Sequence, residues 1–304
     1  MDLNGKRVLV VGSGKSGVAA AELLVKKGIE FVLFDGNKDL DTAALAEKNP
    51  VFAGAQILLG ELKEEDLAEI DLAVLSPGVP TDLPMVDMMR EKGIPIWGEI
   101  ELAYHFAKGR IIAITGTNGK TTTTSLVGQI MANYYDDVKV VGNIGIPYTS
   151  VAADTTDETV TVAEISSFQL ETTHDFAPEV TAILNITPDH LNRHHTMECY
   201  IETKESITKN QTAQDTCVLN YEDEVLRAFG ETLKAKVVYF SSKRKLDRGL
   251  YLDGEDIFYA DGQTDVKVIN VNELNILGKH NYENVMAAVG MSLSFGVPME
   301  KIVE

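Results

Sequence analysis

The chain has 304 residues, of which 44% are hydrophobic and 24% are charged, and its formal net charge is −19. This composition is typical of a folded globular protein, and the length is enough for two domains. The acidic balance argues against a nucleic-acid partner, because a polynucleotide backbone requires a basic surface. No apolar run approaches the roughly 18 residues that a membrane-spanning helix needs.

The sequence contains no sign of export. Its first residues, Met1 to Arg7, lead directly into an apolar segment and lack the charged, apolar and small-residue order of a signal peptide. The two cysteines, Cys199 and Cys217, do not form a disulfide framework, and we expect both to be core thiols. A cytoplasmic location is therefore expected.

The first hundred residues alternate between strand-like and helix-like segments. An apolar run at Arg7–Val11 leads to Gly12, and apolar residues then recur at helical spacing from Ser16 until Gly28 ends the helix. Further apolar runs predict strands at Phe31–Phe34, Leu72–Leu75 and Ile94–Trp97. Such alternation is typical of a parallel sheet covered by helices.

A glycine motif lies between the first predicted strand and helix. The run Gly12-Ser13-Gly14-Lys15-Ser16-Gly17 fits G-x-G-x-x-G, and Asp35 ends the next strand, where a ribose-binding acid stands in dinucleotide-binding domains. Three interpretations remain open at this point. They are an NAD-binding domain, diphosphate binding without a nicotinamide, and glycines required only for a tight turn.

A second α/β unit is predicted to begin near Gly109. Arg110–Thr115 is a predicted strand and Thr122–Asn133 a predicted helix, and later apolar runs predict strands at 138–141, 160–163, 180–184, 217–219 and 237–239. Three short segments then follow one another without helices and predict a small antiparallel appendage at 250–252, 257–259 and 266–269. A helix at His280–Phe295 completes this unit.

A phosphate-binding loop is the strongest local motif. Gly116-Thr117-Asn118-Gly119-Lys120-Thr121 lies between the predicted strand and helix. Backbone N–H groups and the positive helix end bind phosphate, the lysine reaches the β- and γ-phosphates, and the threonine hydroxyl ligates Mg²⁺. The usual first glycine would fall at Ile114, so this is a shorter variant that starts at Gly116.

Three further polar positions are candidates for the same site. Glu164 follows a predicted strand and could hold Mg²⁺, although a solvated strand-end carboxylate would look the same. His190 follows the next strand in the same way, but the neighbouring His194 and His195 also fit a surface cluster. Lys204 lies in a polar helical stretch, and its position alone indicates a surface lysine.

Together these motifs resemble those of the Mur ligases, the ATP-dependent amide-forming enzymes of peptidoglycan precursor synthesis. The loop from Thr115 to Thr123 is similar to that family's ATP loop, which the folylpolyglutamate synthases share. Three more stretches carry the resemblance, which covers essentially the whole chain: Gly142-Asn143-Ile144-Gly145, Glu164-Ile165-Ser166-Ser167-Phe168-Gln169-Leu170-Glu171 and His280-Asn281-Tyr282-Glu283-Asn284. The second stretch resembles that of the members that add D-glutamate.

The resemblance implies a reaction and an architecture. ATP would phosphorylate the carboxylate of UDP-N-acetylmuramoyl-L-alanine, and the amine of D-glutamate would attack the acyl phosphate. The implied fold is α/β, with a Rossmann-like UDP-substrate domain at 1–98, a P-loop-type ATPase domain at 99–297 and the start of a C-terminal domain at 298–304. Without that third domain we expect no amide product from the chain alone. No obligate protein partner is implied.

The resemblance also implies roles for individual residues. Catalysis would use Lys120, Glu164, His190 and Lys204. Two Mg²⁺ ions would be held by Thr121, Glu164, His190 and Lys204, the lysine as a carbamate formed with CO₂. ATP would be bound by Gly116, Thr117, Asn118, Gly119, Lys120, Thr121 and Thr122, with Asn281 and Asn284 near the adenine. The UDP-linked substrate would contact Ser13, Gly14, Lys15, Ser16, Asp35, Asn37, Gly78, Asn143, Ser166 and Gln169.

Other functions stay open on the sequence alone. A folylpolyglutamate synthase is one, although the Rossmann-like first domain and the Phe168-Gln169-Leu170 run count against it. An NAD-dependent dehydrogenase that contains a phosphate loop is another, and a titration with NADH would distinguish it. A non-catalytic nucleotide-binding module is the third.

Overall fold

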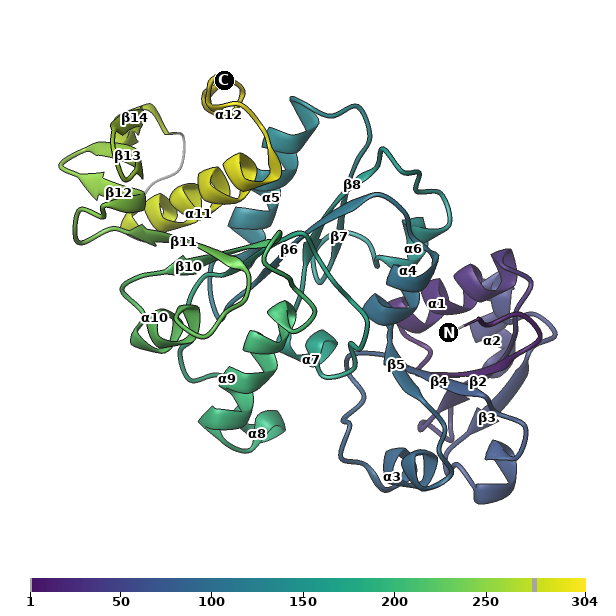
Figure 1. The fold of residues 1–304 in the computed structure, drawn as a ribbon. Coiled ribbons are helices and arrows are strands. Elements are labelled where there is room, and N and C mark those ends of the chain that lie inside the picture. Colours follow the sequence, from purple (N-terminus) through teal and green to yellow (C-terminus); the bar gives the residue numbers. More distant parts are fainter. Residues whose placement is uncertain (1, 275–277) are drawn as a thin grey trace. The chain divides into compact units, whose positions relative to one another are not determined.

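The computed structural model describes residues 2–274 and 278–304, which form two compact units. The first unit contains the chain up to Lys108 together with Ile146–Thr156 and Phe168–Phe176. The second contains the described residues of Gly109–Gly145, Asp157–Ser167 and Ala177–Glu304. Each unit has its own sheet with helices packed on it (Figure 1). No helix in these described ranges combines the length and the apolar character that crossing a bilayer requires.

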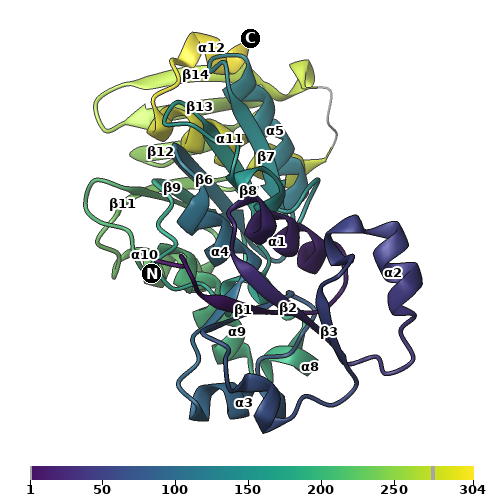
Figure 2. The ribbon, with the colours of Figure 1, turned by 90° about the vertical axis from the view of Figure 1, so that its right-hand side faces the viewer.

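The first unit is built on a parallel five-stranded sheet in the order β3-β2-β1-β4-β5. Its strands are β1 (Arg7–Val11), β2 (Glu30–Asp35), β3 (Gln56–Leu59), β4 (Leu72–Leu75) and β5 (Ile96–Gly98). Its helices include α1 (Lys15–Lys26), α2 (Thr42–Lys48), α3 (Pro84–Glu91), α4 (Glu99–Phe106) and α6 (Thr149–Ala152). The four predicted strands are present, although the last lies at Ile96–Gly98 and not at the predicted Ile94–Trp97, and strand β3 was not predicted. Strands β1, β2 and β3 of this sheet are labelled in Figure 2.

Buried apolar side chains line both faces of this sheet. In β1, Val8, Leu9, Val10 and Val11 are all at most 1% exposed, which explains the unbroken apolar run in the sequence. The carboxyl ends of β1 and β4 lie side by side, because Val11 pairs with Leu75. The loops that follow these two strands therefore meet at one edge of the sheet, where ligands bind in folds of this type.

Gly17 allows α1 to lie close to the end of β1. An added Cβ atom at Gly17 would stand 1.8 Å from the carbonyl oxygen of Gly12, whereas a Cβ at Gly14 would meet nothing within 4 Å. The last glycine of the G-x-G-x-x-G run thus has a packing role. Gly12 has a positive φ of +101°, and a Cβ atom there would stand 2.8 Å from Ser76 Oγ, so of the three glycines only Gly14 is free of such a constraint.

We expect Gly17→Ala to destabilise the first unit by about 1–3 kcal/mol, because backbone atoms must move to make room for the methyl group. Gly36→Ala is the control, because Gly36 is exposed and an added Cβ there would meet nothing within 4 Å, and it should change the free energy of unfolding by less than about 0.5 kcal/mol. Urea unfolding can be followed by the fluorescence of Trp97, the single tryptophan of the chain, which lies in this unit. Equal stability of the two variants would contradict the packing role of Gly17.

The second unit is built on a nine-stranded sheet in the order β14-β13-β12-β11-β10-β9-β6-β8-β7. The parallel part contains β6 (Arg110–Thr115), β7 (Val138–Gly142), β8 (Val160–Glu164), β9 (Val180–Ile183), β10 (Thr216–Asn220) and β11 (Lys236–Ser241). The other strands are β12 (Arg248–Asp253), β13 (Asp256–Asp261) and β14 (Asp265–Asn270). The helices are α5 (Lys120–Ala132), α7 (Ser167–Leu170, shared with the first unit), α8 (Leu191–His194), α9 (Met197–Glu205), α10 (Glu224–Gly230), α11 (Lys279–Phe295) and α12 (Met299–Val303).

The three antiparallel strands continue the large sheet. β12 pairs in parallel with β11, through Phe240 with Leu250 and Ser241 with Tyr251, and only then pairs antiparallel with β13. The prediction of antiparallel strands is confirmed, and the structure adds that they extend the parallel sheet. Helices α5 and α11 pack against each other over this sheet (Figure 1).

Strand β6 lies between β8 and β9, and the loops after these three strands contain the predicted site residues. It pairs with β8 on one side and β9 on the other, so that Ile114 is level with Glu164 and Thr115 with Ile183. All three strands are parallel, and their carboxyl ends share one edge. The loops after β6, β8 and β9 are therefore brought together, as the sequence predicts for the residues that follow these strands.

Candidate functional site

The phosphate loop of the second unit turns into α5 at Gly119. This residue has a φ of +83°, in the left-handed region that favours glycine, and it is the N-cap of α5. An added Cβ would stand 2.3 Å from Oδ1 of Asn284, a side chain that is 5% exposed. The predicted ATP residue Asn284, on α11, is thus packed directly against the loop.

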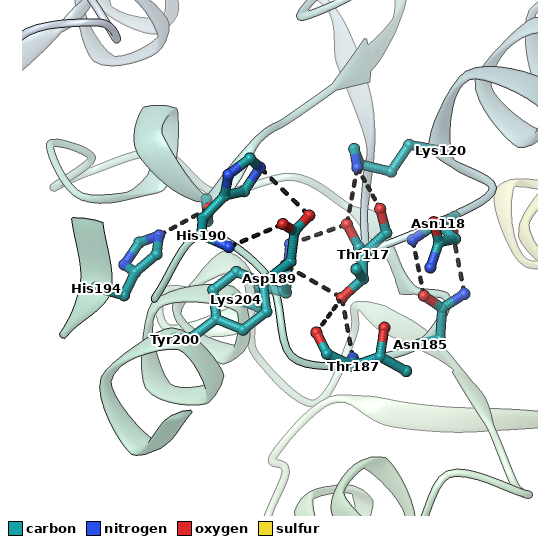
Figure 3. A network of polar contacts seen from close by, with 12 residues as sticks. Thr117, Asn118, Lys120, Asn185, Thr187, Asp189, His190, His194, Tyr200 and Lys204 are labelled. Atoms are coloured by element: carbon teal, nitrogen blue, oxygen red, sulfur yellow. Dashed lines mark hydrogen bonds and ion pairs between the residues drawn. The ribbon is translucent and has the colours of Figure 1, made fainter. Parts of the chain in front are cut away.

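The loop is held in shape by the chain segment that follows β9 (Figure 3). Asn185 accepts from the backbone N–H groups of Thr117, through its carbonyl at 2.9 Å, and of Asn118, through Oδ1 at 2.8 Å. Its Nδ2 donates to the carbonyl of Asn118 at 3.0 Å, and the N–H of Thr187 donates to Thr117 Oγ1 at 3.0 Å. Sequence reasoning missed Asn185, although its place directly after a predicted strand was a usable signal.

Two lysines bind the same backbone carbonyl. The Nζ atoms of Lys120 and Lys204 each donate to the oxygen of Gly116 at 2.9 Å, and Lys120 also donates to Thr117 at 2.9 Å. Lys204 is 2% exposed, so the interpretation as a surface lysine is wrong. Helix α9 begins with an exposed turn but directs Lys204 inward, which is why a polar helical pattern concealed it.

Burial lowers the pKa of both amines. It lowers the pKa of Lys204 to about 7, helped by the positive charge of Lys120 and opposed by Asp189. Burial also lowers the pKa of Lys120, which Glu164 and Asp189 oppose. A lysine that is neutral near pH 7 is a nucleophile, whereas an ordinary lysine ammonium is not.

Glu164 is hydrogen-bonded both to Thr121 of the phosphate loop and to Asn143, a candidate substrate-binding residue. Its side chain is 1% exposed, Oε2 accepts from Thr121 Oγ1 at 2.9 Å, and Oε1 accepts from Asn143 Nδ2 at 2.7 Å. A buried carboxylate beside a hydroxyl supplies hard oxygen ligands of the kind that Mg²⁺ takes. Thr121 and Glu164 therefore fit the implied Mg²⁺ site, and Asn143 fixes the orientation of the carboxylate.

His190 has a strained backbone next to the lysines. Its φ is +52°, which is uncommon for a residue other than glycine, and such strain concentrates at functional sites. Its Nε2 lies 3.4 Å from Oδ2 of Asp189, and its backbone N–H donates to Oδ1 of Asp189 at 2.8 Å. Figure 3 shows His190, Asp189, Lys204 and Lys120 around Thr117.

The interpretation of the neighbouring histidines as a surface cluster does not hold for His194. His194 is 2% exposed and its Nε2 lies 2.9 Å from Ser167 Oγ. Its ring packs on Tyr200, whose hydroxyl lies 3.1 Å from Thr117 Oγ1 and whose ring is 4.7 Å from Lys204 Nζ. Tyr200 was missed by sequence reasoning, although its spacing of four from Lys204 places both on one face of α9.

A cavity of about 390 Å³ lies beside the phosphate loop. It is lined by Asn118, Gly119, Leu184, Asn185, Phe240, His280, Glu283 and Asn284. Asn284 donates from Nδ2 to Oδ1 of Asn281 at 3.1 Å, so Asn281 supports Asn284 but does not line this cavity. The position between the loop and α11 suits the base of a nucleotide whose phosphates lie on the loop.

The first unit contains a larger cavity, of about 680 Å³. It opens at the ends of β1, β2 and β4 and includes Gly12, Asp35 and Gly78 among its lining residues. Burial pushes the pKa of Asp35 upward, but hydrogen bonds from Ser13 and Asn37 hold it below its ordinary value. Ser13 donates to Asp35 Oδ2 from its N–H at 3.0 Å and from Oγ at 2.5 Å. Asn37 donates its N–H to Oδ1 at 2.9 Å.

The structure also describes the positions of the other predicted site residues. Gly14 is the N-cap of α1, and Lys15 and Ser16 form its first turn, beside this cavity's glycine loop but outside its lining. Thr122 lies in the first turn of α5 and Ser166 follows β8. Gln169 belongs to the first unit and donates from Nε2 to Glu99 at 2.9 Å. Of the two cysteines, Cys217 is buried as expected, whereas Cys199 is exposed, contrary to expectation.

A glycine loop between a central parallel strand and a helix, with a lysine, a threonine hydroxyl and a strand-end carboxylate around it, defines a nucleotide-binding α/β protein of the P-loop type. Comparison with known families makes this more specific. The Mur ligase middle domain matches residues 114–292, and the N-terminal domain of the MurD-like Mur ligases matches residues 6–98. The chain belongs to the Mur ligase family.

Similar proteins support this membership along the whole chain. A UDP-N-acetylmuramoylalanine–D-glutamate ligase of Lachnoclostridium phytofermentans is 56% identical over 304 residues, which cover 100% of this chain and 67% of the relative. One of Lachnospira eligens is 57% identical with the same coverage. The crystal structure of a UDP-N-acetylmuramate:L-alanyl-γ-D-glutamyl-meso-diaminopimelate ligase from Neisseria meningitides shares the fold, with a TM-score of 0.59, 15% identity and coverage of 98% of this chain and 96% of that one.

Proposed function

We propose that this chain carries the ATP site and the UDP-substrate site of a ligase that joins D-glutamate to UDP-N-acetylmuramoyl-L-alanine. The observation that carries the proposal is the group of Lys120, Lys204 and the Thr121–Glu164 pair around one phosphate loop. The relatives with 56% and 57% identity are named for this reaction, and the chain spans 67% of their length.

The phosphate loop would bind the triphosphate and neutralise its charge. Lys120 is folded back on the carbonyls of Gly116 and Thr117, and phosphate oxygens would take over these hydrogen bonds. Transfer of the γ-phosphoryl group to the alanine carboxylate brings two anions together, so fixed positive groups stabilise the transition state. The bond from the γ-phosphorus to the bridging oxygen breaks as the bond to the carboxylate oxygen forms, giving ADP and an acyl phosphate.

Thr121 and Glu164 would hold one Mg²⁺, which supplies charge neutralisation at the β- and γ-phosphates. Asn143 keeps Glu164 in place from the other side through its bond to Oε1. His190 is the candidate ligand for a second Mg²⁺, and its strained backbone beside Asp189 supports a functional role.

Lys204 would carry a carbamate. The side chain is buried next to the ammonium of Lys120, so a positive charge on Lys204 is destabilised and a negative charge is stabilised. The neutral amine forms an N–C bond with CO₂ and releases one proton, which leaves a carbamate anion. This anion would supply oxygens for the second Mg²⁺, a role that the ammonium of lysine cannot fill.

The cavity of the first unit would take the UDP part of the substrate. Its volume of about 680 Å³ suits a nucleotide, and the start of α1 at Lys15 gives a helix N-terminus for the diphosphate. Asp35 lines the cavity with its carboxylate held by Ser13 and Asn37, so that it is oriented before the ligand arrives. This interpretation replaces the NAD site that the glycine motif left open.

Two separate calorimetric titrations of the 304-residue chain test the two sites. We expect UDP-N-acetylmuramoyl-L-alanine and ATP with Mg²⁺ each to bind with one site per chain, and NADH not to bind. Amide formation is tested in a chimera in which residues 1–304 replace the matching two thirds of the 56%-identical relative. A chain that binds ATP but not the UDP-linked substrate, or a chimera without D-glutamate-dependent release of ADP, would refute the proposal.

A further inference from the structure

The cavity of about 390 Å³ beside the phosphate loop is lined by a carboxylate that pairs with no cation among the described residues. Glu283, on α11, is half-buried at this cavity. Its Oε1 accepts from Ser242 Oγ at 2.5 Å and its Oε2 accepts from Asn220 Nδ2 at 3.4 Å, and both partners are neutral. A negative charge beside the proposed site of an anionic triphosphate is electrostatically unfavourable. A hydrogen bond donated by the ligand to the carboxylate would offset this repulsion.

The carboxylate of Glu283 can accept further hydrogen bonds. An ionised carboxylate has about four lone-pair positions and no proton to donate. Ser242 and Asn220 occupy one position on each oxygen. The amide of Asn220 is held in its direction, because its Oδ1 accepts from the backbone N–H of Glu222 at 3.0 Å, so that Nδ2 is the atom turned to Glu283. A ligand group that meets this carboxylate therefore has to be a hydrogen-bond donor.

The partners of Glu283 place its carboxylate at a distance from the phosphate loop. The loop follows β6, and β9, β10 and β11 come next in the sheet. Asn220 is the last residue of β10 and Ser242 follows β11. Because neighbouring strands lie about 4.8 Å apart, β10 and β11 are about 10 Å and about 14 Å from β6. The cavity thus extends from Asn118 and Gly119 of the loop to the carboxylate of Glu283 near these two strands.

The part of a nucleotide that reaches this distance is the base. With the terminal phosphates on the loop, the ribose lies nearer to the loop and the base lies farther away. Phe240 of β11, which is 1% exposed, and Leu184, which is 2% exposed, also line the cavity and give it apolar walls of the kind that bind flat ring systems. The base of ATP donates hydrogen bonds through its exocyclic amine, whereas guanine has a carbonyl oxygen at that position.

We propose that Glu283 is a specificity-determining residue for the nucleotide, whose carboxylate accepts a hydrogen bond from the exocyclic amine of adenine. This inference rests on the proposed function, in which the phosphates of ATP lie on the loop and its base lies in this cavity. A carbonyl oxygen in place of the amine would face the carboxylate and be repelled, so the same contact favours ATP and disfavours nucleotides without that donor.

Removal of the amine from the ligand and of the carboxylate from the protein tests the contact. Purine riboside triphosphate is ATP with a hydrogen in place of the amine. We expect its dissociation constant with Mg²⁺, measured by calorimetry on the 304-residue chain, to be at least about tenfold that of ATP, the effect of one lost hydrogen bond to a charged group. In Glu283→Ala the ratio of the two dissociation constants should fall to within about twofold, because the acceptor of the amine is gone.

Controls separate this contact from other effects of the substitution. Glu231→Ala removes an exposed acid at the end of α10 in the same unit, outside the cavity lining, and should keep the tenfold ratio. Glu283→Leu keeps most of the side-chain volume, and it should lower the ratio as Glu283→Ala does, even if the alanine variant fails to fold. The ratio of the dissociation constants of 2′-deoxy-ATP and ATP should be the same with and without Glu283, because the carboxylate does not contact the ribose.

The outcomes distinguish the inference from the proposed function. Calorimetry that finds no binding of ATP with Mg²⁺ to the unaltered chain overturns the proposed function itself. If ATP binds and purine riboside triphosphate binds equally well, the amine makes no contact and the inference is overturned. If the tenfold ratio persists in the variants at Glu283, another residue accepts from the amine. A 2′-deoxy-ATP ratio that changes in these variants would assign the carboxylate to the ribose and overturn its contact with the base.

Discussion

Replacement of Lys120 by alanine is expected to reduce turnover of the chimera by about 10²-fold or more. One preorganised charge contact to a developing anion contributes on that scale. Lys120 can make this contact, because its Nζ donates to the carbonyls of Gly116 and Thr117 in the loop that would bind the phosphates. The rate of ADP release in the presence of saturating substrates is the measurement.

The control for Lys120→Ala is Lys243→Ala, which removes an exposed lysine of the same unit and should leave turnover unchanged. The dissociation constant of ATP with Mg²⁺ shows whether the lost charge acts on binding or on the chemical step. Turnover within threefold of the unaltered chimera would mean that the loop does not carry the transferring phosphate.

Replacement of Lys204 by alanine should lower turnover by at least about 10²-fold and should be partly reversed by acetate or formate. The carbamate presents two oxygens, and a small carboxylate that diffuses into the space left by the side chain can do the same. Lys209→Ala, which removes an exposed lysine just beyond α9, should have no effect and need no rescue.

The protonation of Lys204 gives this prediction a pH dependence. Its pKa is lowered to about 7, so the neutral amine that reacts with CO₂ is the minor form below pH 7 and the major form above it. Bicarbonate-dependent activity of enzyme freed of CO₂ should therefore rise between about pH 6 and pH 8. Full activity of Lys204→Ala without any added carboxylate would refute the carbamate.

Much of the fold could be predicted because the central parallel strands are short apolar runs that are separated by clear helix signals. Arg7–Val11, Leu72–Leu75 and Arg110–Thr115 have the predicted bounds, since buried parallel strands read as unbroken apolar runs. Strand β3, Gln56–Leu59, was missed because its residues are only half-buried at the edge of the sheet. Its apolar run, Ile57-Leu58-Leu59, is shorter than the apolar runs of the central strands.

Prediction of the site succeeded where a motif fixes its own geometry and failed where tertiary packing decides. The glycine loop and the residues after β8 and β9 could be placed from strand order alone. The burial of Lys204 could not, because the polar pattern of α9 shows which residues face water only once its partners are known. Asn185 and Tyr200 act by supporting Thr117 and Asn118, and no local pattern marks a residue that supports another.

The anchored loop after β6 has a thermodynamic consequence for nucleotide binding. Because Asn185 and Thr187 already bind Thr117 and Asn118, the loop has lost its conformational entropy during folding and not during association. Ligand binding then needs no ordering of the backbone, so more of the interaction with the phosphates appears as affinity. The free folded state is destabilised in return, because two lysine side chains converge on the carbonyl of Gly116 before any anion is bound.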